Sequence, residues 1–504
     1  MPDTLTPAPD LPPAVPPARP LRFVHRGAVV AVDDLPPTTT VLRWLREHAR
    51  CTGTKEGCNE GDCGACTVLL GEAGPDGRVA FKPVNSCIQF LPVLDGKALL
   101  TVEDLGGTHP VQQALVACHG SQCGFCTPGF AMTLAALAER SAGGPAPTRP
   151  AIADALSGNL CRCTGYRPIL DAAERVPALP PQPLATPALA GALAAAQADT
   201  ALHYQAPGAA PFHAPRSLDA LAALLAARPQ ARLLAGCTDI GLWVNKQFRA
   251  LGEIVYLGEV AELQAIAPEA DGWLRIGAGA SLQAAWDALA AWWPGDSGVA
   301  EMSRRFASPP VREAGTLGGN LANGSPIGDG APVLMALGAE LLLRHGAANR
   351  TMALADFYLG YLRNALAPGE FIEALRVPPP GPGEQLRCYK LSKRHDCDIS
   401  ALAAGLWLRL DGGRVADARF AFGGLAATVA RAAGAEAAVR GQPWTAETLR
   451  AAQAALDADF QPLSDLRASA GYRRRAAGQL LQRLWLATRA DAPLAADQLS
   501  VWSL

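Results

Sequence analysis

The cysteine thiols are the side chains of this sequence whose spacing most directly indicates a chemical function. Ten of the thirteen cysteines lie in the first third of the chain. Four of them follow the pattern Cys58-x4-Cys63-x2-Cys66, with Cys87 further on, and this is the spacing of a plant-type 2Fe–2S centre. We therefore predict an iron–sulfur site at this loop. The alternative is a four-cysteine zinc site, although zinc ribbons favour two matched short pairs.

The glycines of the same loop fit an anionic metal cluster. Four thiolates around two ferric ions leave a net negative charge, which nearby backbone N–H groups stabilise. Gly57, Gly61 and Gly64 lack a Cβ atom and allow the backbone to fold closely around the metal.

A second group of cysteines precedes two expected helices. The pair Cys123-x2-Cys126 lies just before Pro128, and the pair Cys161-x-Cys163 lies just before a second proline. Helix N-termini offer free N–H groups and a positive dipole end to an anion. Taken alone, these four cysteines could form either a zinc site or an iron–sulfur centre. Because the first loop has the spacing of a 2Fe–2S centre, we predict that they form a second one.

The other five cysteines belong to neither group, and we expect most of them to be small buried side chains. Their individual roles stay open at this point. They are Cys51, Cys118, Cys237, Cys388 and Cys397.

Length and composition restrict the protein class. The chain has 504 residues, a formal net charge of −2 and 49% hydrophobic residues, which suggests three or four domains and gives no electrostatic reason to expect a nucleic-acid partner. No stretch is long and apolar enough to cross a membrane, and no secretory signal is apparent. We expect a soluble cytoplasmic protein in which the thiols stay reduced.

Patterning along the chain predicts a multidomain α+β protein. Helices are expected at 40–49, 110–117, 128–140, 149–156, 168–176, 218–227 and 282–291. Strands are expected at 28–32, 66–70, 232–235, 254–257, 274–278, 340–343 and 401–410. The expected divisions are a disordered tail (1–20), an α+β unit (21–104), a helical unit (105–177), a linker (178–210) that is partly helical near 187–198, an α/β or α+β domain (211–384) and a last domain (385–500).

Two glycine-rich loops in the second half suggest a dinucleotide. The first, 233–241, follows an expected strand, and the second runs from Thr316 to Asp329. Such loops bring backbone N–H groups against phosphate. The Gly277-Ala278-Gly279 segment is not a Rossmann fingerprint, because Leu282 stands where the third glycine is required.

Two longer motifs carry a family resemblance. The segments GSQCGFCTPG (120–129) and GNLCRCTGYRPI (158–169) closely resemble the signature of the molybdenum hydroxylases. The resemblance implies a plant-type ferredoxin β-grasp domain followed by a four-helix 2Fe–2S domain. It also implies that the metal ligands are Cys58, Cys63, Cys66, Cys87, Cys123, Cys126, Cys161 and Cys163.

The second half resembles the flavin part of the same family. The resemblance implies an FAD-binding domain of the vanillyl-alcohol-oxidase type and a C-terminal α+β flavoprotein domain. The FAD contacts carried over by position are Leu233, Leu234, Ala235, Gly236, Cys237, Thr238, Asp239, Ile240, Phe306, Thr316, Asp329, Ile372 and Lys390. The family often has Asn, Gly or Ser at the position of Cys237.

The order of the domains is similar to that of the iron–sulfur and flavin subunit of bacterial xanthine dehydrogenases. It implies electron transfer from hypoxanthine or xanthine oxidation, at a molybdopterin centre on a large partner subunit, through two 2Fe–2S clusters and FAD to NAD⁺. An α2β2 heterotetramer is expected. Tyr361 and the acidic loop 395–398 resemble features near the nicotinamide approach, and no side chain is nominated as a catalytic acid, base or nucleophile.

Alternatives remain open at this point. The chain could serve another molybdenum hydroxylase, such as an aldehyde or N-heterocycle dehydrogenase. It could also be a stand-alone electron-transfer flavoprotein or a zinc-stabilised scaffold. The exact reducing substrate and the preference for NAD⁺ over O₂ are not fixed by these residues.

Overall fold

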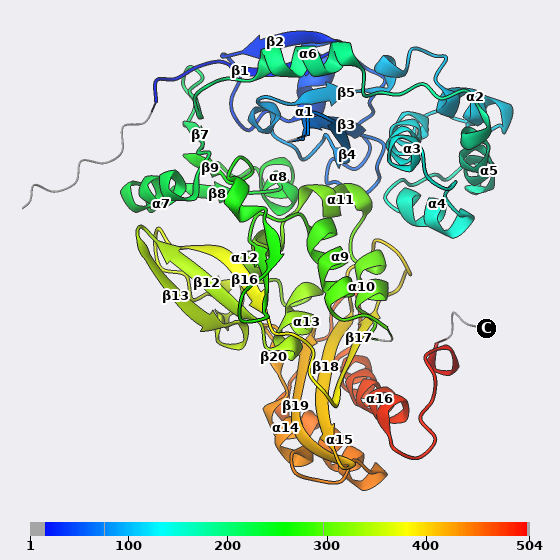
Figure 1. Ribbon diagram of the computed structural model, residues 1–504, viewed down its shortest axis with the longest axis vertical. Helices are drawn as coiled ribbons and strands as arrows, with labels where there is room; N and C mark the ends of the chain where they lie inside the picture. The colour runs from blue at the N-terminus through cyan, green and yellow to red at the C-terminus, as the bar shows by residue number, and fades with distance from the viewer. Residues whose placement is uncertain (1–15, 75, 296, 501–504) are drawn as a thin grey trace, which may run out of the picture.

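The computed structural model describes residues 16–74, 76–295 and 297–500. The N-terminal sheet and the helical unit lie side by side at one end of the long axis, and the C-terminal domain lies at the other end (Figure 1). Most of the predicted disordered tail, 1–15, lies outside the described residues. Within the part described, no helix is long and apolar enough to span a membrane.

The first domain is a five-stranded mixed sheet with the strand order β2-β1-β5-β3-β4. Only β1 and β5 pair in parallel. Alternate apolar side chains of β1 pack against Trp44 in the core. The strands are β1 (Leu21–His25), β2 (Ala28–Val32), β3 (Thr67–Ala73), β4 (Val79–Asn85) and β5 (Ala98–Leu100).

The helix expected at 40–49 begins where the threonine cap predicts. The Thr40 hydroxyl accepts a hydrogen bond from the Arg43 backbone N–H at 3.2 Å. The first turn is α1 (Val41–Arg43), and the helix continues as a wider π turn (Trp44–His48). Its end leads directly into the loop of the first cysteine group.

The second domain is helical, as predicted. Its helices pack around Phe130 and Ile152, which are completely buried. Helix N-termini here carry the proline at the first or second position that the sequence predicted. The helices are α2 (Pro110–Ala117), α3 (Thr127–Ser141), α4 (Arg149–Leu156) and α5 (Arg167–Arg175).

The segment expected as a linker, 178–210, contains regular structure. Helix α6 (Pro187–Ala196) lies along the first sheet (Figure 1), and its Leu193 is completely buried. Strand β6 (Leu202–Tyr204) already pairs with the next domain. Arg19, in the expected tail, forms an ion pair with Asp95 at 2.7 Å. The helix agrees with the helical pattern expected near 187–198. The strand and the ion pair were not expected, because very short elements gain their stability from packing rather than from local pattern.

The third domain holds two sheets. The smaller has the strand order β6-β7-β9-β8 and the larger β10-β11-β16-β12-β13. The strands of the smaller sheet are β7 (Phe212–Ala214), β8 (Arg232–Leu234) and β9 (Ile254–Tyr256), in addition to β6. Those of the larger are β10 (Ile266–Pro268), β11 (Leu274–Gly277), β12 (Glu340–His345), β13 (Ala348–Ala353) and β16 (Phe371–Val377).

Seven α-helices and a short hairpin surround these sheets in the described part of the domain. Helices α9, α12 and α13 pack in one core around Trp286. The helices are α7 (Leu218–Ala227), α8 (Thr238–Asn245), α9 (Leu282–Trp292), α10 (Val299–Arg305), α11 (Pro309–Ala314), α12 (Leu317–Asn323) and α13 (Gly330–Leu337). The hairpin consists of β14 (Tyr358–Gly360) and β15 (Arg363–Asn364).

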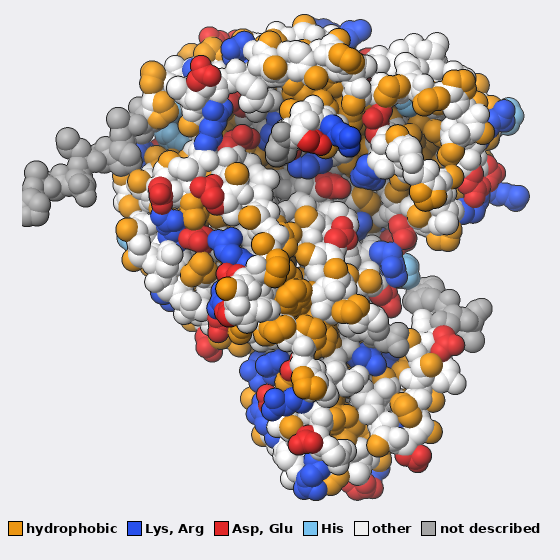
Figure 2. Space-filling model, viewed as in Figure 1, with side chains coloured by type: hydrophobic (Ala, Val, Ile, Leu, Met, Phe, Trp, Pro, Cys, Tyr) orange, Lys and Arg blue, Asp and Glu red, His pale blue; other side chains and the backbone are white. Residues whose placement is uncertain are grey.

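The last domain is an antiparallel sheet in the order β17-β18-β19-β20, covered by helices. Basic side chains gather over its β19 and β20 side (Figure 2), and among the basic residues of this domain Arg431 and Arg440 both pair with Glu436. The strands are β17 (Glu384–Leu391), β18 (Leu402–Asp411), β19 (Arg414–Gly423) and β20 (Ala430–Arg431). The helices are α14 (Ala433–Val439), α15 (Ala446–Asp459) and α16 (Ala470–Thr488).

Candidate metal centres and flavin site

The four thiols of the first cysteine group lie together. The Cys58 sulfur contacts those of Cys63 and Cys87, and the Cys66 sulfur also contacts that of Cys87. Cys66 and Cys87 are buried, whereas Cys58 and Cys63 are half-buried. The fold thus gathers the set that the spacing predicted, with one side of it open toward solvent.

Backbone N–H groups point at these sulfurs. The Asp62 and Cys63 amides donate to the Cys58 sulfur at 3.3 and 3.4 Å, and the Cys58 amide donates to the Cys63 sulfur at 3.4 Å. Hydrogen bonds from Cys63 and Cys87 lower the pKa of the Cys58 thiol, and a hydrogen bond from Cys87 lowers that of Cys66. The same contacts raise the pKa of the Cys63 and Cys87 thiols. Each contacting pair therefore holds one thiol in the thiolate form, which is the form that binds iron or zinc.

Two glycines show why a bulkier residue does not fit this cradle. A Cβ atom on Gly57 would lie 2.8 Å from the Cys63 sulfur. Gly64 has a φ of +69°, and a Cβ there would lie 2.2 Å from the Gly158 carbonyl oxygen. The loop is thus shaped closely around its sulfurs, and the donor set fits an anionic iron–sulfur centre.

The second group forms two contacting pairs at helix starts. Cys123 contacts Cys163, and Cys126 contacts Cys161. Cys126 is the residue that caps α3, and Tyr166, with a φ of 66°, precedes α5. The Cys161 amide donates to the Tyr166 hydroxyl at 3.0 Å. Both expected helix N-termini therefore lie at this group.

The electrostatics of the second group differ between its pairs. The Phe125 backbone N–H lowers the pKa of Cys123, whereas burial raises that of Cys126 to about 12. Cys123 and Cys163 are exposed.

Within residues 16–74, 76–295 and 297–500, no three His, Cys, Asp or Glu side chains are arranged around one point as a single metal ion would require.

The two cysteine loops touch each other, which the sequence did not indicate. The Leu160 amide, next to Cys161, donates to the Cys63 carbonyl at 3.0 Å. The buried Asn159 amide group donates to the Gly64 carbonyl at 3.1 Å. The only sequence signal was the glycine content of both loops, since a close backbone approach requires residues without Cβ.

The first glycine-rich loop connects β8 to α8. Cys237 has a left-handed φ of 59° and is buried, and α8 begins at Thr238. A Cβ on Gly236 would lie 2.0 Å from the Ala314 carbonyl oxygen, so this loop packs tightly against the segment that leads to Thr316. Leu234 is completely buried, whereas Leu233 and Ile240 are half-buried and Asp239 is exposed.

The second glycine-rich loop faces the first. The Thr316 hydroxyl accepts from the Gly319 amide at 3.1 Å and caps α12. A Cβ on Gly319 would lie 3.9 Å from that of Ala235. Two loops with helix starts thus oppose each other, and this arrangement suits the pyrophosphate of a dinucleotide.

Asp329, at the end of the second loop, forms a buried ion pair with Lys390 of β17, and the Lys390 nitrogen lies 2.5 Å from an Asp329 carboxylate oxygen. The Ser400 hydroxyl donates to the second Asp329 oxygen. Ile372, on β16, is buried in the same core against which the half-buried Phe306 packs. Of the predicted FAD residues, the structure thus brings the two loops together and pairs Asp329 with Lys390, while Ile372 and Phe306 belong to the adjoining core.

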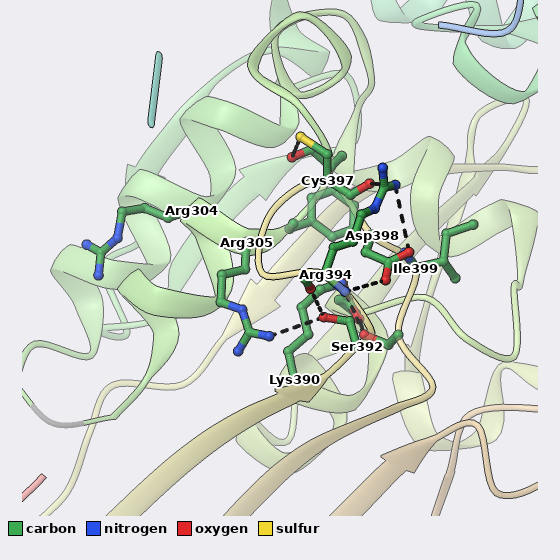
Figure 3. Close-up of polar contacts among 12 residues, drawn as sticks. Arg304, Arg305, Lys390, Ser392, Arg394, Cys397, Asp398 and Ile399 are labelled. Atoms are coloured by element: carbon green, nitrogen blue, oxygen red, sulfur yellow. Dashed lines mark hydrogen bonds and ion pairs between the residues drawn. The ribbon is translucent and has the colours of Figure 1, made fainter. Parts of the chain in front are cut away.

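The loop after β17 lies beside these residues (Figure 3). Arg305 donates to the Ser392 hydroxyl at 3.2 Å, while Arg304 points away (Figure 3). The Cys397 thiol donates to the Ser157 carbonyl of the helical domain at 3.0 Å. Tyr361 is exposed at the turn between β14 and β15. The acidic loop therefore contacts the cysteine-bearing half directly.

A crevice of about 710 Å³ lies between the first sheet and the third domain. Its lining includes Ala235, Gly236 and Thr316. Lys97, from the first domain, pairs there with Glu72 at 3.6 Å and with Glu259 of the third domain at 3.0 Å. Ion pairs thus join the two halves beside the flavin loops.

Comparison with known families gives three matches along the chain. Residues 101–174 match a [2Fe-2S] binding domain, and residues 204–380 match the FAD binding domain in molybdopterin dehydrogenase. Residues 387–488 match the CO dehydrogenase flavoprotein C-terminal domain. The multidomain α+β organisation predicted from the sequence is confirmed at this level.

Individual relatives agree with these matches. Xanthine dehydrogenase from Emericella nidulans is 32% identical over 500 residues, covering 87% of this chain and 36% of the relative. The chain therefore spans about a third of the length of this relative. The Gallus gallus xanthine dehydrogenase/oxidase is 29% identical, with 85% of this chain and 37% of the relative covered.

Two solved structures each match slightly more than half of the chain. A chain of reconstituted CO dehydrogenase from Oligotropha carboxidovorans superposes with a TM-score of 0.51 and 32% identity, covering 55% of this chain and 97% of that one. A chain of quinoline 2-oxidoreductase from Pseudomonas putida 86 gives a TM-score of 0.50 and 26% identity, with coverages of 56% and 98%.

Proposed function

This chain belongs to the molybdenum hydroxylase family, as an iron–sulfur and flavin component, and from this we propose that it is the electron-transfer subunit of a xanthine dehydrogenase. In this role it takes electrons from hypoxanthine or xanthine oxidation at a molybdopterin-bearing partner and delivers them to NAD⁺. When bound, two 2Fe–2S centres and FAD supply the electron-carrying chemistry.

The single observation that carries this proposal is the continuity of the candidate sites. The Leu160 amide joins the second cysteine group to Cys63 of the first at 3.0 Å. The Gln89 side chain, two residues after Cys87, donates to the Gly236 carbonyl in the flavin loop at 3.0 Å. The second cysteine group thus adjoins the first, and the first adjoins the flavin loop, which supports electron transfer in that order.

The chain's own residues have defined tasks in this proposal. The eight thiolates of the two groups hold the iron, and the backbone amides around Cys58 stabilise the negative charge there. The loops at Gly236 and Thr316 bind the FAD pyrophosphate through helix starts. The other FAD contacts proposed from the resemblance surround these loops.

The exposed side of the second group supports a partner subunit. Cys123 and Cys163 are exposed, and the Phe125 ring beside them is 47% exposed. Leu160 and Tyr166 are also exposed there. Apolar side chains around a solvent-facing metal group mark a surface that another protein covers. We assign it to the large molybdopterin-binding subunit, in an α2β2 heterotetramer.

NAD⁺ is proposed as the electron acceptor. Tyr361 offers an exposed aromatic ring. The loop after β17 carries Asp396, which pairs with His395 at 2.8 Å, and Asp398, which lies 3.9 Å from the Arg394 guanidinium. Rapid-mixing measurements of flavin reoxidation by NAD⁺ and by O₂ test this assignment. Reoxidation that is faster with O₂ than with NAD⁺ contradicts it.

A second candidate is the same role with another reducing substrate. Solved structures similar to slightly more than half of this chain include a CO dehydrogenase and a quinoline 2-oxidoreductase. Xanthine, quinoline and CO, each added to the complex with its partner subunit under anaerobic conditions, distinguish these candidates. Bleaching of the flavin by xanthine alone supports the xanthine dehydrogenase.

Metal and flavin analysis tests the electron-transfer role. We expect about four iron atoms and one FAD per chain, from two 2Fe–2S sites. The Cys63→Ser and Cys126→Ser variants should each remove a different electron paramagnetic resonance (EPR) signal. Cys118→Ser is the matched control and should leave both signals intact. Colourless protein that contains zinc contradicts the proposal.

A further inference from the structure

Helix α8 begins at the flavin loop and lies against the first cysteine group. Just before it, the Gly236 carbonyl accepts the hydrogen bond from Gln89. In the helix itself, Gly241 packs on the segment after Cys87, because a Cβ there would lie 2.7 Å from the Ile88 carbonyl oxygen. One helix therefore spans the distance between the two sites.

The C-terminal end of α8 contacts the backbone of two cysteines. The Asn245 side-chain amide donates to the Cys87 carbonyl at 2.7 Å and to the Asn59 side-chain oxygen at 3.2 Å. The Lys246 ammonium donates to the Cys58 carbonyl at 2.6 Å. These contacts join residues more than 150 positions apart, and they place a positive charge beside a ligand of the predicted centre.

We propose that Asn245 and Lys246 are positioning residues of the first cysteine group, and that the Lys246 charge makes the iron–sulfur centre there easier to reduce. This inference rests on the proposed function. A reduced centre carries one more negative charge than an oxidised one, so a nearby ammonium stabilises the reduced form. Asn245 holds the Cys87 segment against the helix that leads to the flavin loop.

Glu60 limits the influence of the Lys246 charge on the reduction of the first centre. Its carboxylate lies 3.6 Å from the Lys246 nitrogen, and both side chains are 42% exposed. Solvent and the opposite charge screen the ammonium, so its influence is modest and should weaken with added salt. Removing the Glu60 charge takes this partner from the Lys246 ammonium, so the first centre should become easier to reduce.

The test is a redox titration of the holoprotein with its partner subunit, followed by EPR. The Cys63→Ser variant identifies the signal of the first centre. In Lys246→Met, the ratio of reduced to oxidised first centre at a fixed applied potential should fall about threefold, which is a shift of about 30 mV at 59 mV per tenfold change for one electron. The second centre should not shift.

Two further variants keep the charge argument falsifiable even if Lys246→Met folds poorly. Lys246→Arg preserves the charge and should keep the wild-type midpoint, whereas Glu60→Gln should raise it. Arg450→Met, which removes a remote surface charge on α15, is the matched control and should change neither midpoint.

Asn245→Ala tests the positioning role separately. It should alter the shape of the first signal and slow flavin reduction, while the iron content stays the same. If the midpoint potential of the first centre is unchanged in both Lys246→Met and Glu60→Gln, and the wild-type protein shows both signals, this inference is wrong while the proposed function stands. Wild-type protein without two iron–sulfur signals instead refutes the proposed function.

Discussion

The Lys390 ammonium and the Asp329 carboxylate lie 2.5 Å apart, although one belongs to the C-terminal flavoprotein domain and the other to the FAD-binding domain. Their side chains are only 2% and 4% exposed. Ser400 bridges them, because it accepts from Lys390 at 3.1 Å and donates to Asp329. The pair therefore connects two domains through a buried polar cluster.

Breaking this pair should destabilise the junction strongly. In Lys390→Met, the Asp329 carboxylate stays buried without its counter-charge, and the expected loss is about 3–5 kcal/mol in the free energy of unfolding. Urea unfolding measures it. The Lys390→Met/Asp329→Leu double variant should recover most of the loss, because no unpaired charge remains. A single variant as stable as wild type would show that the pair contributes nothing to the junction.

Gly241 should tolerate no side chain. In Gly241→Ala, the new methyl overlaps the Ile88 backbone, and we expect a loss of about 1–3 kcal/mol together with slower flavin reduction. Gly191→Ala is the matched control in α6, where a Cβ meets no atom within 4 Å, and it should be neutral or stabilising by up to about 1 kcal/mol. Thermal unfolding compares the two, and equal effects would contradict the close packing of α8.

Glu72 should make stability depend on acid pH. Burial raises the pKa of Glu72, but the ammonium groups of Lys97 and Lys82 outweigh it and lower the pKa to about 2. Because the folded pKa lies below the unfolded value of about 4.3, the ion pairs stabilise the fold above that value. This contribution is lost as the pH falls toward 2.

The measurement is the free energy of unfolding of Glu72→Gln and wild type between pH 7 and pH 2. We expect a difference of about 1–2 kcal/mol at pH 7, reduced by partial solvent exposure, which shrinks below pH 4.3 or so. Glu447→Gln, on an exposed pair with Arg450, should differ little from wild type at any pH. A constant difference for Glu72→Gln argues against the ionic mechanism.

Cys237 should be chemically inert in the folded protein. Burial raises its pKa to about 12, so at pH 8 only about one thiol in ten thousand is ionised. Brief treatment with iodoacetamide and peptide mapping should label the half-exposed Cys118 and leave Cys237 unmodified. In urea both should react, and equal labelling in the folded state would disprove the assigned burial.

Local signals in the sequence were sufficient for many elements. Helices α2, α4 and α7 begin and end at the predicted residues. The Thr148 hydroxyl caps α4 and the Ser217 hydroxyl caps α7. Each accepts a hydrogen bond from the backbone N–H of the residue three positions later. A cap and a helical period involve only neighbours along the chain, so they are visible without a fold.

Packing decided the elements that the sequence missed. Strand β6, which lies in the segment expected to be a linker, is three residues long and exists by pairing with β7. Arg19 is held by Asp95, which precedes β5, the strand that pairs with β1. Neither feature has a local pattern of its own, because each depends on a partner that is distant in the sequence.

The sequence alone determined which thiols are present, how they are spaced and which family signature surrounds them. Only the tertiary structure decided that Leu160 meets Cys63 and that Asn245 and Lys246 meet the cysteine backbones. Spacing reports contacts within a loop, whereas these contacts arise from how separate domains pack. A hydrogen bond across more than 150 residues leaves no periodic trace in either segment, so it becomes visible only once both are folded.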